Sequence, residues 1–129
     1  MALRLLLAAV LGAGIGFQRE RAGKPAGLRT HMLICIGSAL FALVSAYGFG
    51  LGADLSRVAA GVVTGIGFIG AGAIIHGGEG IVAGLTTAAS IWSVAAIGLA
   101  AGTGLYLLAV VTTTLVLIVL ILPHPRIKG

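Results

Sequence analysis

The sequence predicts an all-α, polytopic membrane protein: a compact bundle of about five transmembrane helices in a single domain, residues 1–129. Hydrophobic residues make up 59% of the chain and charged residues 9%, whereas a soluble domain carries about 25% charged residues. The mean hydropathy is +1.18. A chain of this composition cannot cover a water-exposed surface with polar side chains, so most of its surface must face lipid.

Long apolar runs define the expected spans. A bilayer core about 30 Å thick requires about 20 apolar residues in a helix, with a range of about 17–25. Five segments reach or approach this length: residues 2–17, 32–50, 58–76, 81–101 and 104–122. The first segment is short enough to be a secretory signal, but the glycines that continue it and the charges that follow favour a retained helix.

Glycine is the expected packing residue, with 22 positions in the chain against a usual share of about 7%. Glycines four residues apart allow two membrane helices to approach closely. Glycines on both faces of the third span predict that it is the central helix, and the Gly12/Gly16 pair on the first span is expected to contact a second copy in a homo-oligomer. The packing positions we expect are Gly12, Gly16, Gly61, Gly65, Gly67, Gly70, Gly72, Gly98 and Gly102.

The stretch "HGGEGIVAGLTT" interrupts the apolar pattern before the fourth span. Its glycines favour a re-entrant or broken segment near residues 77–86, with Thr86 as the N-cap of the helix that follows. Irregular backbone at membrane depth requires cover by protein or water. Thr86, Ser90 and Ser93 share one face of this helix, where they either form interhelical hydrogen bonds or line a polar path.

Basic residues predict the orientation in the membrane. Five of the eleven charged residues lie between positions 16 and 31, and Arg126 and Lys128 lie in the tail. Cytoplasmic segments carry an excess of lysine and arginine. With five spans these two regions share one side, which predicts an external N-terminus and a cytoplasmic C-terminus. Without interleaved aromatic residues, the basic clusters favour flanks of membrane spans over nucleic-acid binding.

The carboxylates have two interpretations each. Glu20 is either solvated or pairs with Arg29, which would clamp the ends of the first two spans. Asp54 and Arg57 are close enough to pair across one helical turn. Mg²⁺ prefers carboxylates and water, so Glu20 and Asp54 are the candidate metal ligands, although no metal site is established.

The other candidate residues do not suggest catalysis. His31 is expected to be a hydrogen-bonded residue between helices and not a metal ligand. The sequence carries no nucleophile–base pair, no cluster with metal-ligand spacing and no phosphate loop after a strand. We therefore expect neither enzymatic activity nor a cofactor.

Three stretches together resemble the membrane domain of the MgtC/SapB family: "GIGFQRERAGKPAGLRTHMLICIGSALF", "RVAAGVVTGIGFIGAGAII" and "GLTTAASIWSVAAIGLAAGTGLY". The resemblance implies a bacterial inner-membrane protein of about five spans, associated with growth in low magnesium and with survival inside macrophages. It also implies a transmembrane domain without the soluble C-terminal domain of many relatives. Two positions depart from the family pattern, which usually has proline at Leu55 and often glutamine at Gly61.

The resemblance implies a non-enzymatic role in magnesium or ion homeostasis and stress adaptation, through contacts with membrane proteins such as the proton-translocating ATP synthase. The alternative is a transporter or channel for Mg²⁺, H⁺ or a small polar solute. Ser90 joins the candidates through its position on the polar face of the fourth span. The family pattern marks as functional the residues Glu20, Arg29, Thr30, His31, Asp54, Arg57, Thr86 and Thr87.

Overall fold

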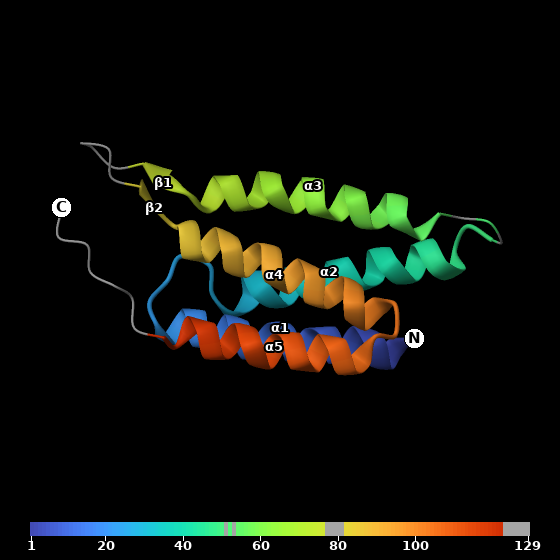
Figure 1. The fold of residues 1–129 in the computed structure, drawn as a ribbon, viewed down its shortest axis with the longest axis horizontal. Coiled ribbons are helices and arrows are strands. Elements are labelled where there is room, and N and C mark those ends of the chain that lie inside the picture. The colour runs from blue at the N-terminus through green and yellow to red at the C-terminus, as the bar shows by residue number, and fades with distance from the viewer. Residues whose placement is uncertain (51, 53, 77–81, 123–129) are drawn as a thin grey trace.

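Five helices form an elongated bundle in the computed structural model, which describes residues 1–50, 52, 54–76 and 82–122 (Figure 1). Two short strands, β1 (Ile75–His76) and β2 (Val82–Ala83), pair antiparallel between the third and fourth helices. The predicted all-α class and five-helix bundle are confirmed. The helices are α1 (Ala2–Arg21), α2 (Leu28–Tyr47), α3 (Leu55–Ala73), α4 (Leu85–Gly102) and α5 (Tyr106–Leu120).

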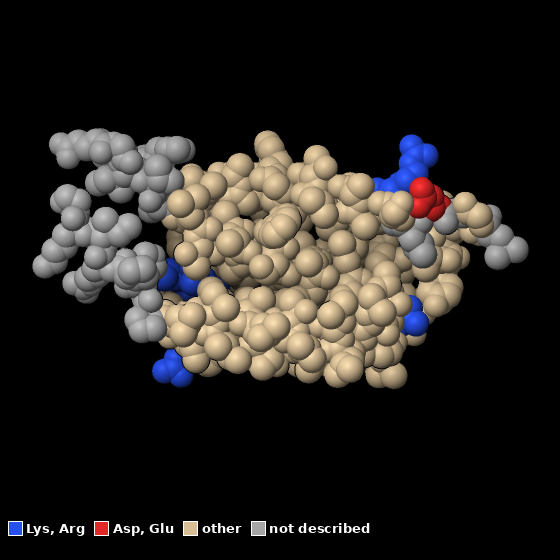
Figure 2. All heavy atoms as spheres, viewed as in Figure 1, with Lys and Arg blue, Asp and Glu red and all other residues tan. Residues whose placement is uncertain are grey.

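Helices α1 to α4 are each long and apolar enough to cross a membrane. Helix α5 has 15 residues and packs along α1 and α4. Figure 2 shows charged side chains at the two ends of the bundle and an uncharged band between them on the face in view. This division is what a bilayer core requires, because charge at membrane depth is costly. The chain is a multi-pass membrane protein.

Helix α4 is the central helix, so the prediction that the third span is central was wrong. Half of the α4 span is buried within the chain, against 17% of the α3 span, and α4 contacts all four other helices. A Cβ atom added at Gly61, Gly65, Gly67 or Gly72 of α3 would meet nothing within 4 Å, and only at Gly70 would it reach α4. Small residues permit close approach, but they do not select which neighbour approaches.

Helix α2 packs closely against both α1 and α4, and glycines of those two helices form the contacts. A Cβ atom at Gly12 would lie 2.8 Å from Cys35 Cβ, and one at Gly16 would lie 2.8 Å from Leu28 Cα. Gly12 and Gly16 therefore pack against α2 of the same chain, and the prediction that they contact a second copy was wrong. On the other side of α2, a Cβ at Gly98 would lie 2.8 Å from Ser38 Cβ.

Several helix ends differ from the sequence-based expectations. Helix α1 continues to Arg21 and α2 begins at Leu28, so residues expected in a loop are helical. Helix α4 begins at Leu85, and its N-cap is Gly84 with a φ of 92°, so the N-cap predicted at Thr86 was wrong. Within the predicted break near residues 77–86, the described part is non-helical only at strand β2 and Gly84, because Leu85 and Thr86 already belong to α4. Residues 77–81 lie outside the described ranges.

The contact at Gly98 yields a stability prediction. Gly98→Ala should lower the free energy of unfolding by about 1–3 kcal/mol, the usual cost of overpacking, because the new methyl group would collide with α2. Gly67→Ala is the matched control, since a Cβ there meets open space and alanine has the higher helix propensity. Unfolding of the purified variants in detergent measures both effects. Equal stability of Gly98→Ala and the wild type would contradict the α2–α4 contact.

Candidate functional site

Four polar side chains are buried together where α1, α2 and α4 meet. We call Arg19, His31, Thr87 and Ser90 the polar cluster; their exposed fractions are 3%, 0%, 2% and 2%. The cluster lies at the end of the bundle that holds the α1–α2 connection and the β1–β2 strands (Figure 1). Burial of so many polar groups is favourable only when they are hydrogen-bonded to one another.

Hydrogen bonds connect the three helices through the cluster. Arg19 Nη2 donates to Thr87 Oγ1 at 2.8 Å. His31 Nδ1 lies 2.9 Å from the carbonyl oxygen of Gly27, and His31 Nε2 lies 2.9 Å from Ser90 Oγ. Because a carbonyl can only accept, Nδ1 carries the proton in the neutral imidazole. The single hydroxyl proton of Ser90 then has two acceptors within reach. One is His31 Nε2, and the other is the Thr87 carbonyl oxygen, 2.8 Å from Ser90 Oγ.

The polar cluster is electropositive. Arg19 forms no ion pair with a described residue, and its Nε atom has no hydrogen-bond partner. His31 and Thr87 lie in the first turns of α2 and α4, and each helix N-terminus carries about half a positive charge. A buried guanidinium beside two helix N-termini attracts anions or electron-rich groups and repels cations.

Glu20 joins the ends of α1 and α2, but through the backbone. Its Oε1 accepts a hydrogen bond from the Leu28 amide at 3.2 Å, where a negative charge is favourable because the helix begins there. Glu20 and Arg29 are both exposed, and no ion pair joins them. Glu20 therefore joins α1 to α2 as predicted, but through the Leu28 amide. The predicted pairing with the Arg29 side chain was wrong.

Asp54 caps helix α3 at the opposite end of the bundle. Its Oδ1 accepts from Ser56 N at 3.0 Å and from Ser56 Oγ at 2.6 Å. These bonds hold the pKa of the Asp54 carboxyl below its ordinary value. Ser56 is therefore its side-chain partner in the structure, and the predicted pairing with the Arg57 side chain was wrong.

Glu20 and Asp54 cannot bind one metal ion together. The 20 residues of α2 separate their ends of the bundle, which is a length of about 30 Å at 1.5 Å per residue. The described residues contain no group of three or more His, Cys, Asp or Glu side chains that could hold a metal. Glu79, the third carboxylate of the chain, lies outside the described ranges.

The remaining predicted residues divide between the two ends. Thr30 lies at the start of α2 and is half-buried, and Thr86 lies at the start of α4 and is exposed. Arg57 is exposed near the start of α3. The structure thus brings His31, Thr87 and Ser90 together, places Glu20, Arg29, Thr30 and Thr86 around the same end, and leaves Asp54 and Arg57 at the other.

A second arginine, Arg4, was not predicted as a site residue. Its Nε donates to Tyr106 Oη at 2.9 Å and its Nη1 donates to the Gly102 carbonyl oxygen at 3.0 Å. The guanidinium carbon lies 5.9 Å from the ring centroids of Tyr47 and Tyr106. Arg4 therefore links α1 to α2, α4 and α5 at the end opposite the polar cluster.

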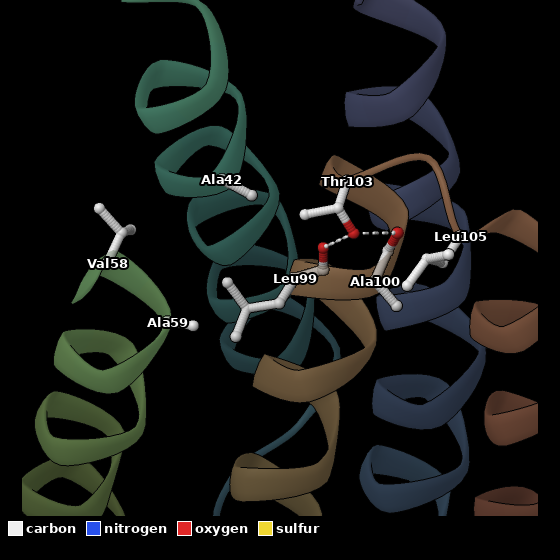
Figure 3. Close-up of a pocket in the computed structure, with 7 residues that line it drawn as sticks. All are labelled: Ala42, Val58, Ala59, Leu99, Ala100, Thr103 and Leu105. Atoms are coloured by element: carbon white, nitrogen blue, oxygen red, sulfur yellow. Dashed lines mark hydrogen bonds between the residues drawn. The ribbon is translucent and has the colours of Figure 1, made fainter. Parts of the chain in front are cut away.

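A cavity of about 220 Å³ lies between α2, α3 and α4 (Figure 3). Its polar side chain, Thr103, donates to the carbonyl oxygens of Leu99 and Ala100 at 2.9 and 3.1 Å. With its one hydroxyl directed to its own helix, the lining suits apolar groups. Its residues are Ala42, Val58, Ala59, Leu99, Ala100, Thr103 and Leu105.

Comparison with known proteins decides the family. The sequence profile of the MgtC family matches residues 5–127. The chain belongs to the MgtC family. It is 52% identical to "Putative magnesium transporter YhiD" of Escherichia coli K12 over 95% of the chain and 60% of that protein. Identity is 43% with SrpB of Synechococcus elongatus, over 93% of the chain and 72% of SrpB.

This MgtC-family chain is also 42% identical to the protein named MgtC of Brucella abortus, over 92% of the chain and 49% of that protein. The chain spans about 60% of the length of YhiD. No solved structure gives a significant match.

Arg19 is the residue of the polar cluster that sequence reasoning missed in this family member. Its charged neighbours Glu20 and Arg21 suggested a solvated loop. The available signal was its spacing: Ala8, Gly12 and Ile15 lie 11, 7 and 4 residues before it, which places all four on one helix face. That face is buried, and it carries Arg19 into the bundle.

The Arg19–Thr87 bond yields a second stability prediction. Thr87→Val should lower the free energy of unfolding by about 1–3 kcal/mol, because it leaves a buried donor of Arg19 without its acceptor. Thr86→Val is the matched control, since Thr86 is exposed one position earlier in the same helix. Chemical unfolding in detergent compares the two variants. A larger loss in Thr86→Val would show that the bond does not stabilise the bundle.

Proposed function

We propose that this chain is a non-enzymatic protein of the bacterial inner membrane that supports growth when magnesium is scarce, acting through contacts with other membrane proteins. Membership of the MgtC family and the magnesium-related name of the relative YhiD support the link to magnesium. The family resemblance makes the proton-translocating ATP synthase a candidate partner.

The buried positive charge of Arg19 is the main observation against conduction of Mg²⁺ through the bundle. A cation that passes the polar cluster would approach the guanidinium and the N-termini of α2 and α4. At about 6 Å and an effective dielectric constant of about 20, a divalent cation and a guanidinium repel each other by about 5–6 kcal/mol. Mg²⁺ would also find no carboxylate in the cluster to replace the waters that it gives up reluctantly.

The alternative function is transport of a cation or small polar solute. One feature favours it: a groove of about 260 Å³ between α4 and α5 is lined in part by the hydroxyl residues Thr86, Ser90, Ser93 and Thr112. Such a path would bypass Arg19 on the α5 side of α4. The name of YhiD is consistent with this alternative.

Two assays separate these functions. In liposomes loaded with a magnesium-sensitive dye, the purified chain should give no Mg²⁺ entry above protein-free liposomes. In a bacterial strain that lacks its own MgtC-family protein, the chain should support growth in low-magnesium medium. Arg19→Gln should lose this support while Arg21→Gln, which removes an exposed charge two residues away, should retain it. Membrane levels of both variants are compared by immunoblot.

Mg²⁺ entry that rises with the amount of wild-type protein would replace the proposed function with transport. Full growth support by Arg19→Gln at normal membrane level would show that the charge of the polar cluster is not needed for this function.

We also propose that the end with the polar cluster is cytoplasmic. Arg19, Arg21, Lys24 and Arg29 lie at that end, against Arg4 and Arg57 at the other, and the positive-inside rule favours this orientation. A reporter fused after Gly129 should then be active in the cytoplasm, and a tag before Met1 should be accessible from outside the membrane. A periplasmic reporter at the C-terminus would reverse the proposed orientation.

A further inference from the structure

The first turn of α4 lies at the surface of the bundle. Its N-cap residue is Gly84, and no side chain in the described part of the chain caps the helix. Leu85 and Thr86, the next two residues, are exposed. The first amides of a helix have no acceptor within the helix, and together with the helix dipole they favour an anion. The start of α4 therefore offers hydrogen-bond donors to an anionic group at the surface.

A buried positive charge lies directly behind this turn. Arg19 is 3% exposed, and its Nη2 donates to Oγ1 of Thr87, the third residue of α4. The Nε atom of the same guanidinium is buried and has no hydrogen-bond partner. A buried charge is costly unless it is paired, and among the described residues Arg19 forms no ion pair. The unpartnered Nε and the amides of α4 suit the same kind of ligand, an anion with several oxygen acceptors.

The starts of α2 and α3 show which chemical group fits such a position. Glu20 Oε1 accepts from the Leu28 amide at the start of α2, and Asp54 Oδ1 accepts from the Ser56 amide at the start of α3. In both places an oxyanion of the chain itself satisfies a free amide and the helix dipole. At the start of α4, the described residues contribute a buried cation and no carboxylate.

The start of α4 lies at the depth of lipid headgroups. On α1, at the same end of the bundle (Figure 1), the guanidinium carbon of Arg21 lies 5.7 Å from the ring centroid of Phe17. Phe17 is exposed and its ring suits acyl chains, whereas a guanidinium favours the headgroup region. The pair marks the boundary of the hydrocarbon core. Arg19 lies two residues from each, or about 3 Å along the helix axis, and lipid phosphates lie at this boundary.

We propose that this end of the bundle binds one anionic phospholipid, whose phosphate oxygens accept hydrogen bonds from the first amides of α4 and from the guanidinium of Arg19. Exposed basic residues at the same end, Arg21, Lys24 and Arg29, favour lipids of net negative charge. The lipid neutralises the polar cluster and joins the start of α4 to α1. This inference rests on the proposed function, because it names a ligand for the cluster whose charge growth support is proposed to need.

Binding of defined lipids to the purified full chain tests the proposal. Native mass spectrometry from detergent counts the lipids that stay bound during titration with phosphatidylglycerol or phosphatidylcholine. The wild type should bind phosphatidylglycerol at least about tenfold more tightly than phosphatidylcholine. Arg19→Gln should weaken phosphatidylglycerol binding by about tenfold, or about 1.4 kcal/mol. Arg57→Gln, which removes an exposed charge at the opposite end, should bind it like the wild type.

Thr86 provides a second pair of variants, in which Arg19 is unchanged. Thr86→Asp places a carboxylate in the first turn of α4, where it stabilises the helix and competes with the phosphate. It should therefore weaken phosphatidylglycerol binding by about tenfold. Thr86→Asn has nearly the same shape without the charge, so it should bind like the wild type. Circular dichroism verifies that both variants fold.

Three outcomes would overturn the lipid site. They are equal binding of phosphatidylglycerol by the wild type, Arg19→Gln and Thr86→Asp; displacement of the lipid by inorganic phosphate alone, which would assign the site to a free anion; and growth support in low magnesium by a chain that binds no phosphatidylglycerol. The last outcome would leave the proposed function intact. A chain that binds the lipid through Arg19 but does not support growth would overturn the proposed function alone.

Discussion

The close approach of α2 to both α1 and α4 is the constraint on which the rest of the structure depends. At membrane depth the hydrophobic effect does not drive helices together, so contact between backbones must provide the attraction. Gly12 and Gly16 on one side and Gly98 and Gly102 on the other leave no room for a side chain. Because these backbones touch, polar groups from three helices come within hydrogen-bond distance at one end of the bundle.

The polar cluster follows from this packing. Arg19 is buried because α1 continues as a helix past its glycine face, and Thr87 Oγ1 reaches it only because α4 lies against α1 and α2. The arrangement places a guanidinium and two helix N-termini in one region, which makes the region unfavourable for cations. Helix α3 contributes no residue to the cluster and packs mainly on α4 and α2. This packing leaves most of the α3 glycines uncovered.

Most residues of the candidate site could be predicted from the sequence, but the hydrogen bonds that join them could not. His31, Thr87 and Ser90 were expected as functional residues, and Glu20 was expected to join the first two helices. Glu20 instead bonds the Leu28 amide, because α2 begins four residues earlier than hydropathy indicates and places a free amide beside the carboxylate. Arg19 was missed because charge density suggested a loop, whereas the helix period that buries it extends through residue 21.

The sequence by itself determined the membrane class, the five helices, the family and the separation of charge between the two ends. The family follows from specific residue motifs along the chain. The other three properties depend on local composition and periodicity, which each segment carries independently of its neighbours. Only the tertiary structure decided which glycines contact a neighbouring helix. The glycines of α3 are chemically identical to those of α1 and α4, yet a Cβ added at most of them would meet open space. A missing side chain permits contact with any partner, and the partner is selected by the arrangement of all the helices together.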